Sequence, residues 1–177
     1  DGSGLYQYET IRGETVEIYG KGVYKHMSAD VAIQGIAQDF VTVFLAIPLL
    51  VISLIGFLRG SKKASLLLAG TFGYFFVTYL FYTAMGMYNY LFIPYLALLC
   101  LSFFGLFIQL RHIYSFKLED LFNKNNSGKL VGGFLLFNTI AIAIMWLGII
   151  VPPLINGSLY PKELQHYTTL IVQGFDL

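Results

Sequence analysis

The sequence predicts an all-α membrane protein, a four-transmembrane-helix bundle with a small extracytoplasmic β-hairpin at its N-terminus. Four apolar runs are each long enough to cross a hydrocarbon core about 30 Å thick as a helix. Only 12% of the 177 residues are charged, against about 25% in a soluble domain. Basic residues gather in two of the loops between the runs: Arg59, Lys62, Lys63, Arg111, Lys117, Lys124 and Lys129.

The polar first segment, residues 1–27, predicts the hairpin. Polar and apolar side chains alternate over residues 15–19, which favours a strand, and Gly20-Lys21-Gly22 is typical of a turn. Residues 23–24 are expected to return antiparallel, and residues 9–11 are candidates for a third strand. Because a lone hairpin is marginally stable in water, we expect it to rest on the ends of the helices.

The transmembrane domain is predicted to cover residues 28–153. Ser28 is suited to cap the first helix, since its hydroxyl can accept from the free N–H groups of the first turn. The predicted spans are residues 40–58, 64–87, 91–110 and 130–151. We expect Pro48 to kink the first span and Pro152-Pro153 to end the fourth.

The charge distribution predicts the orientation in the membrane. Cytoplasmic loops are enriched in Lys and Arg, so the basic loops 59–63 and 111–129 should be cytoplasmic. The hairpin, the uncharged turn at residues 88–90 and the tail at residues 154–177 are then extracytoplasmic. No signal-peptide pattern is visible at the start. An apolar stretch near the end predicts a further span beyond residue 177.

Polar side chains near the outer face mark a candidate ligand site. Asp39 begins the first span, where a carboxylate is costly unless it is paired, solvated or interfacial. It either marks the water boundary or handles a ligand or proton in an outward-facing cavity. Hydroxyls and amides in spans either line such a cavity or join helices. The candidate ligand-binding residues are Gln34, Gln38, Asp39, Tyr74, Thr78, Tyr82, Asn89 and Asn138.

Cofactor and metal chemistry finds little support in the sequence. The single cysteine, Cys100, excludes an intramolecular disulfide, a thiol redox pair and a cysteine-based zinc site. His26 and His166 are weak candidates for metal ligands, because their spacing matches no recognised ligand pattern. We therefore expect no metal and no cofactor. No nucleotide-binding glycine motif or basic patch indicates a nucleotide or nucleic acid.

Several segments carry a resemblance to a known group of proteins. They are residues 9–13, 16–24, 37–42 and 88–92. The pattern resembles an uncharacterised family of bacterial multi-pass integral membrane proteins with no assigned reaction. This resemblance implies a plasma-membrane location and flanking spans outside this chain. It carries over no catalytic residue.

Three functions fit these observations. The first is a non-enzymatic protein, a sensor or transporter component, that binds a small or lipid-like ligand in an outward-facing polar pocket. The second is an enzyme acting on a lipid or quinone at the outer leaflet, with Asp39 as general base and His26 or His166 as its partner. The third is a structural subunit that contacts another membrane protein through small residues. Those residues are Ala69, Gly70, Gly73, Gly132 and Gly133.

Overall fold

The structure is a computed structural model. It describes residues 2–9, 13, 15–84, 89–116 and 128–157. The chain forms two units, Asp1–Leu121 and Phe122–Leu177. Within the described residues, four helices are long and apolar enough to cross a membrane, as the sequence predicts. They are Ala29–Leu58, Lys62–Ala84, Phe92–Tyr114 and Gly128–Ile155.

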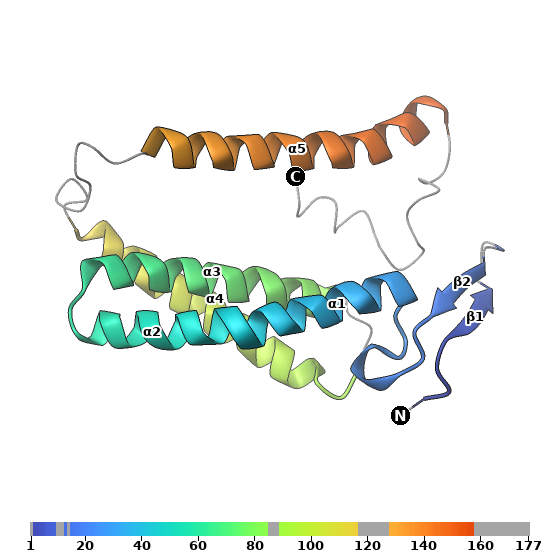
Figure 1. Cartoon of the computed structure of the whole chain (residues 1–177), viewed down its shortest axis with the longest axis horizontal. Helices are drawn as coiled ribbons and strands as arrows, with labels where there is room; N and C mark the ends of the chain where they lie inside the picture. Colours follow the sequence, from blue (N-terminus) through green and yellow to red (C-terminus); the bar gives the residue numbers. More distant parts are fainter. Residues whose placement is uncertain (1, 10–12, 14, 85–88, 117–127, 158–177) are drawn as a thin grey trace. The chain divides into compact units, whose positions relative to one another are not determined.

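A small antiparallel hairpin precedes the helices (Figure 1). Strand β1 (Tyr6–Glu9) pairs with β2 (Thr15–Ile18), with Tyr6 opposite Ile18. The prediction of a hairpin is confirmed. The predicted pairing of residues 15–19 with residues 23–24 was wrong. Residues 23–24 lie in a 3-10 turn, η1 (Gly22–Tyr24), and β2 pairs instead with the chain before it.

Two glycines explain why the chain after β2 does not return as a strand. Gly20 and Gly22 have φ of +69° and +58°, a left-handed conformation that side chains other than glycine rarely adopt. The chain therefore turns twice within three residues and closes a short loop. The N–H of Tyr19 donates to the carbonyl of Met27 at 2.9 Å, and helix α1 begins directly after this loop.

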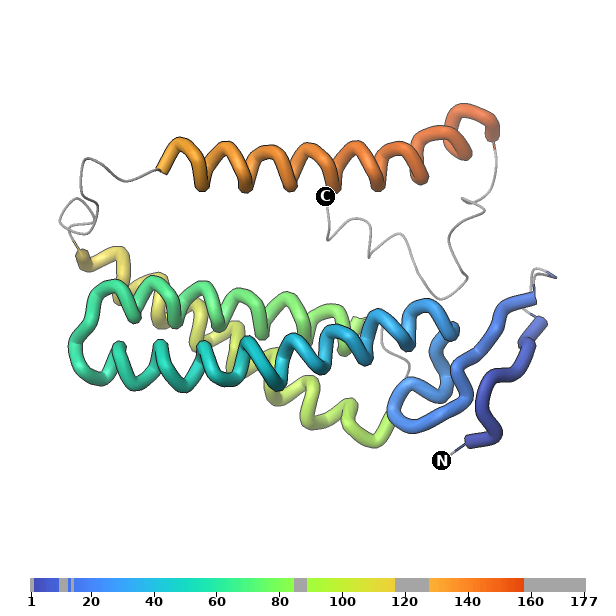
Figure 2. Tube along the Cα trace, in the orientation of Figure 1, coloured from blue at the N-terminus to red at the C-terminus, as the bar shows by residue number. Residues whose placement is uncertain are grey.

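The first long helix contains a wide turn before Pro48. It consists of α1 (Ala29–Val41), the π-helix η2 (Thr42–Ala46) and α2 (Ile47–Leu58), which follow one another without a break (Figure 2). Pro48 lacks an N–H, and its ring conflicts with the carbonyl four residues earlier. The N–H of Ile47 reaches back five residues to Thr42, and this wider turn accommodates the proline. At the other end, the Ser28 hydroxyl accepts from the N–H of Val31 at 3.4 Å, which confirms the predicted cap.

Helix α3 (Lys62–Ala84) packs against both α2 and α4 (Phe92–Tyr114). Its Leu68 is 2% exposed and belongs to the small core between them. A Cβ placed on Gly105 of α4 would lie 2.9 Å from the Phe72 ring, so the glycine permits the close approach of α3 and α4. The buried amide of Gln109 also donates to the Ser65 carbonyl at 3.2 Å and ties α4 to α3.

Helix α5 (Gly128–Ile155) belongs to the second unit. The predicted end at Pro152-Pro153 was wrong, since both prolines lie inside the helix. A proline removes its own N–H but keeps a carbonyl that accepts, and the N–H of Asn156 bonds to Pro152 at 3.0 Å. Residues 85–88, 117–127 and 158–177, with His166 and most of the predicted tail, lie outside the described residues.

Candidate functional site

The centre of the candidate site is the carboxylate of Asp39 on α1. Its Oδ2 accepts a hydrogen bond from the Tyr24 hydroxyl at 2.6 Å, and its Oδ1 accepts one from the Tyr82 hydroxyl at 2.8 Å. Tyr24 comes from the 3-10 turn, whereas Tyr82 lies near the end of α3. Because both oxygens are held, the carboxylate has a fixed orientation while its side chain stays partly exposed.

The two tyrosines also pack against each other and against α1. Their hydroxyl oxygens are 3.3 Å apart, and the Tyr82 hydroxyl lies 3.3 Å from the carbonyl of Gly35. A Cβ placed on Gly35 would come within 2.6 Å of the Tyr24 ring. Gly35 therefore leaves the space in which the buried Tyr24 ring reaches Asp39.

The environment of Tyr24 keeps its hydroxyl protonated. Burial raises the pKa of Tyr24 well above the ordinary value, and the hydrogen bond to Asp39 raises it further. The residue is only 9% exposed and lies outside the predicted spans. At neutral pH the phenol is thus a permanent donor to the carboxylate, because ionisation would place two negative charges side by side.

A second set of hydrogen bonds lies further along the same two helices. The amide nitrogen of Gln38 donates to Tyr74 at 2.8 Å and to Thr78 at 3.2 Å. The Thr42 hydroxyl, at the start of the π-helix, is 2.8 Å from the Tyr74 hydroxyl. These neutral groups satisfy one another, so this set joins the first helix to α3.

Further aromatic rings pack against Tyr82, whose hydroxyl bonds to the carboxylate. Tyr79 and Tyr82 of α3 lie with ring centroids 6.1 Å apart, and Tyr95 of α4 lies 6.0 Å and 5.1 Å from them. All three rings are partly exposed. We call the five residues Tyr24, Asp39, Tyr79, Tyr82 and Tyr95 the Asp39–tyrosine cluster.

The structure brings some of the predicted site residues together and leaves others apart. Five of them share the hydrogen bonds described above: Gln38, Asp39, Tyr74, Thr78 and Tyr82. Asn89 lies beside the 3-10 turn, where its amide donates to the Val23 carbonyl at 3.4 Å and its oxygen accepts from the N–H of Leu91 at 2.8 Å. Gln34 is exposed and takes no part in these bonds among the described residues. Asn138, in the second unit, bonds to the Phe134 carbonyl of its own helix at 2.8 Å.

Sequence reasoning did not include four participants, Tyr24, Thr42, Tyr79 and Tyr95. Thr42 carried a signal, since it follows Gln38 by four residues and so shares its helix face. Tyr24 and Tyr95 carried none, because they come from other segments of the chain and meet Asp39 and Tyr82 only after folding.

Metal and histidine chemistry has no geometric basis in the described part of the chain. No group of three or more His, Cys, Asp or Glu side chains there could hold a metal ion. His26 is exposed, and the hydrogen bonds of Asp39 go to tyrosines. His166 lies outside the described residues.

No protein-family model, curated protein sequence or solved structure matches this chain. The structure by itself shows a general class, a mostly helical protein with four long apolar helices and a small hairpin among the described residues. The resemblance to a bacterial membrane family stays a prediction.

Proposed function

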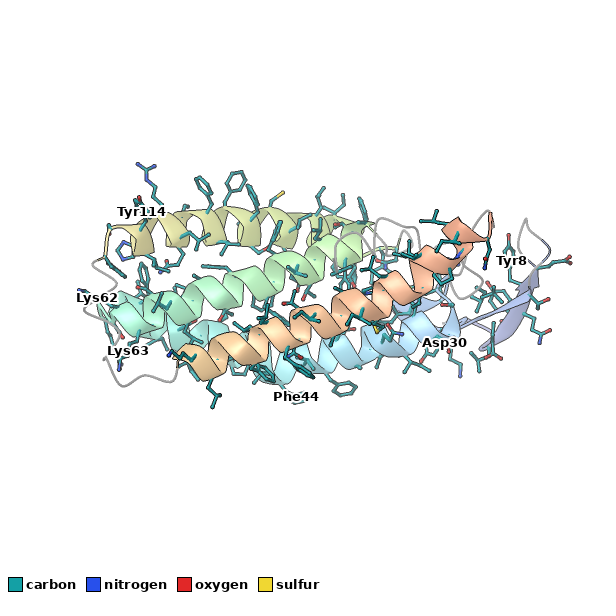
Figure 3. All side chains as sticks on the ribbon, turned by 90° about the horizontal axis from the view of Figure 1, so that it is seen from above. Tyr8, Asp30, Phe44, Lys62, Lys63 and Tyr114 are labelled. Atoms are coloured by element: carbon teal, nitrogen blue, oxygen red, sulfur yellow. The ribbon has the colours of Figure 1, made fainter. Side chains whose placement is uncertain are left out.

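We propose that this chain is a multi-pass integral membrane protein of the plasma membrane, with its four long helices spanning the bilayer. The support comes from the apolar side chains that the helices expose on their outer surfaces. Phe44 is 72% exposed, and Figure 3 shows it directed away from the neighbouring helices. Phe104, Phe107 and Ile108 of α4 are likewise exposed. Continuous apolar surfaces of this kind are costly in water and favourable in lipid.

The proposed orientation places the hairpin outside the cell. Figure 3 shows Lys62 and Lys63 at the opposite end of the helices from Asp30, and Arg59 and Arg111 belong to the same basic end. The enrichment of Lys and Arg in cytoplasmic loops assigns this end to the cytoplasm. The basic loops 59–63 and 111–129 would then be inside, and the visible termini outside.

Cysteine labelling tests this orientation. In a Cys100→Ser background, a membrane-impermeant maleimide should modify Lys21→Cys on intact cells. Lys62→Cys should react only after the cells are permeabilised, because its end of the helices faces the cytoplasm in the proposed orientation. Lys21 and Lys62 are both exposed, so access through the membrane decides the result. Modification of Lys62→Cys alone on intact cells would refute the orientation. Equal modification of both would refute the spanning arrangement.

Within this membrane protein, we propose that the Asp39–tyrosine cluster binds a small or lipid-like ligand, as part of a sensor or transporter. The observation that supports this is a partly exposed carboxylate with a fixed orientation and no basic partner among the described residues. Ionisable side chains within membrane spans are costly and typically mark the sites or pathways of substrates, ions or protons.

Mass spectrometry of the purified protein tests ligand binding. The protein is extracted in mild detergent, and the retained small molecules and lipids are compared between wild type and Asp39→Asn. Asp30→Asn is the matched control, since Asp30 is an exposed carboxylate on the same helix. A species kept by wild type and the control but lost from Asp39→Asn is expected. Identical extracts from all three proteins would refute the proposal.

A structural or partner-binding subunit is the second candidate, and the bonds of Gln38 with Tyr74 and Thr78 favour it. Polar groups that satisfy one another in this way are typical of contacts between helices. This candidate predicts identical extracts together with a lower stability of Gln38 variants. The third candidate, a lipid or quinone enzyme, has less support because Asp39 contacts tyrosines while His26 is exposed.

A further inference from the structure

We infer that the Asp39–tyrosine cluster recognises a ligand that carries an ammonium group. This inference rests on the proposed ligand-binding function and names the chemical class of the ligand. It comes from two features of the cluster: an unneutralised carboxylate that neutral donors hold in place, and electron-rich rings that pack around one of these donors, Tyr82.

The first feature is the charge of the site. The hydroxyls of Tyr24 and Tyr82 orient Asp39 without neutralising it. Lys21 and Lys25 of the N-terminal segment are exposed, and no described basic residue forms an ion pair with Asp39. Arg59, the next basic residue along this helix, is about 30 Å away at 1.5 Å per residue. A ligand that enters here meets a single uncompensated negative charge.

The second feature is the set of aromatic rings. The ring centroids of Tyr79, Tyr82 and Tyr95 lie 5.1 to 6.1 Å from one another, and the hydroxyl of Tyr82 bonds to the carboxylate of Asp39. Ring faces attract cations, and aromatic side chains grouped in this way bind quaternary and substituted ammonium groups. A carboxylate beside such rings favours an organic cation, because it supplies charge while the rings supply apolar contact.

Other ligand classes fit the cluster less well. An anion would be repelled by Asp39. A metal ion requires several oxygen or nitrogen ligands, and no suitable group of His, Cys, Asp or Glu side chains exists among the described residues. An ammonium group has two sources, a free amine in solution or the head group of a zwitterionic lipid. Both present the same chemistry to Asp39.

The free-amine source is tested with labelled choline and labelled ethanolamine. The full chain is placed in nanodiscs of phosphatidylglycerol, which lacks an ammonium group, and equilibrium binding is measured. We expect saturable binding that is about tenfold or more weaker in Asp39→Asn and unchanged in Asp30→Asn. The uncharged analogue 3,3-dimethyl-1-butanol, which has carbon in place of the nitrogen of choline, should not displace the probe.

The lipid source is tested in nanodiscs that contain phosphatidylethanolamine and phosphatidylglycerol in equal amounts. Native mass spectrometry should then show phosphatidylethanolamine retained by wild type and Asp30→Asn but lost from Asp39→Asn. Binding of the free amines with no lipid preference assigns the ligand to solution. Retention of phosphatidylethanolamine with no binding of the free amines assigns it to the bilayer. Either result supports an ammonium ligand.

A second pair of variants tests the inference independently, in case Asp39→Asn does not fold. Tyr95→Leu removes a ring and should weaken binding roughly threefold or more. Tyr95→Phe keeps the ring and should weaken binding less. Equal effects of these two substitutions would argue against recognition by the rings. Each protein is first checked for a single symmetric peak in size-exclusion chromatography.

The outcomes separate this inference from the function on which it rests. Equal displacement by the uncharged alcohol, or by sodium chloride at the same ionic strength, would overturn the ammonium inference and leave ligand binding in place. Unchanged affinity in Asp39→Asn would also overturn the ammonium inference, because the probe would then bind away from Asp39. Failure of every probe and both lipids to bind, together with identical detergent extracts, would overturn both proposals.

Discussion

The hydroxyl of Tyr24 lies 2.6 Å from Oδ2 of Asp39 and connects the segment before the helices to the first helix, 15 residues further along the chain. The same carboxylate accepts from Tyr82 on α3. One side chain thus holds three segments together. Its removal should affect both the position of the N-terminal segment and the packing of α1 on α3.

Tyr24→Phe should loosen the N-terminal segment. The substitution keeps the ring but deletes a hydrogen bond to a carboxylate, which is worth about 1.5–3 kcal/mol. We expect a lower thermal midpoint in detergent and faster proteolysis within residues 1–27, because the segment loses its link to α1. Limited proteolysis followed by mass spectrometry measures the cleavage rate.

Tyr8→Phe is the control for this experiment, since Tyr8 lies on β1 and is 50% exposed. It should cleave at the wild-type rate. Equal cleavage of wild type and Tyr24→Phe would show that the bond between Tyr24 and Asp39 does not hold the segment in place.

Gly35→Ala should destabilise the protein although alanine favours helices. The added methyl group would lie 2.6 Å from the Tyr24 ring, so the ring must move away from Asp39. Overpacking of this kind costs about 1–3 kcal/mol. Thermal unfolding followed by circular dichroism should show a lower midpoint. Gly70→Ala, where a Cβ meets no atom within 4 Å, should keep or raise the midpoint.

Gln38→Leu should weaken the contact of the first helix with α3. It removes the bonds to Tyr74 and Thr78, and such bonds between membrane helices average about 0.6 kcal/mol. A double-mutant cycle with Thr78→Val should give a coupling energy of about 0.5–1 kcal/mol, measured by unfolding in detergent. Gln34→Leu, at an exposed position, should change stability little. A coupling energy near zero would contradict a role of Gln38 in joining the helices.

The stability of the protein should fall at alkaline pH, partly through Tyr24. Its pKa in the folded protein lies above the ordinary value of 10.0, so the folded state holds the proton more tightly than the unfolded state. The resulting stabilisation is complete below pH ~10 and is lost as the pH rises above that value. Thermal midpoints measured from pH 7 to 11 should therefore decrease less steeply for Tyr24→Phe than for wild type. Parallel decreases would contradict the contribution of Tyr24.

The long helices could be predicted because their signal is local. A run of about 20 apolar residues has the length and composition of a membrane-spanning helix, whatever the rest of the chain does. Each of the four runs appears as a helix in the structure. The Ser28 cap is also local, since the hydroxyl bonds to an N–H three residues away. Tyr74, Thr78 and Tyr82 follow one another at intervals of four residues, and this helical spacing places their side chains on one face.

The sequence alone therefore determined the helices and the polar face of α3, and it singled out Asp39 as a candidate site residue. Only the tertiary structure decided the partner of Asp39, because the sequence predicts a turn at residues 20–22 but not that the chain after it brings Tyr24 to Asp39. The strand pairing of the hairpin and the ring of Tyr95 beside Tyr82 were decided in the same way. Contacts between distant segments depend on where the chain turns and which helices pack together, and no local pattern of side chains encodes that.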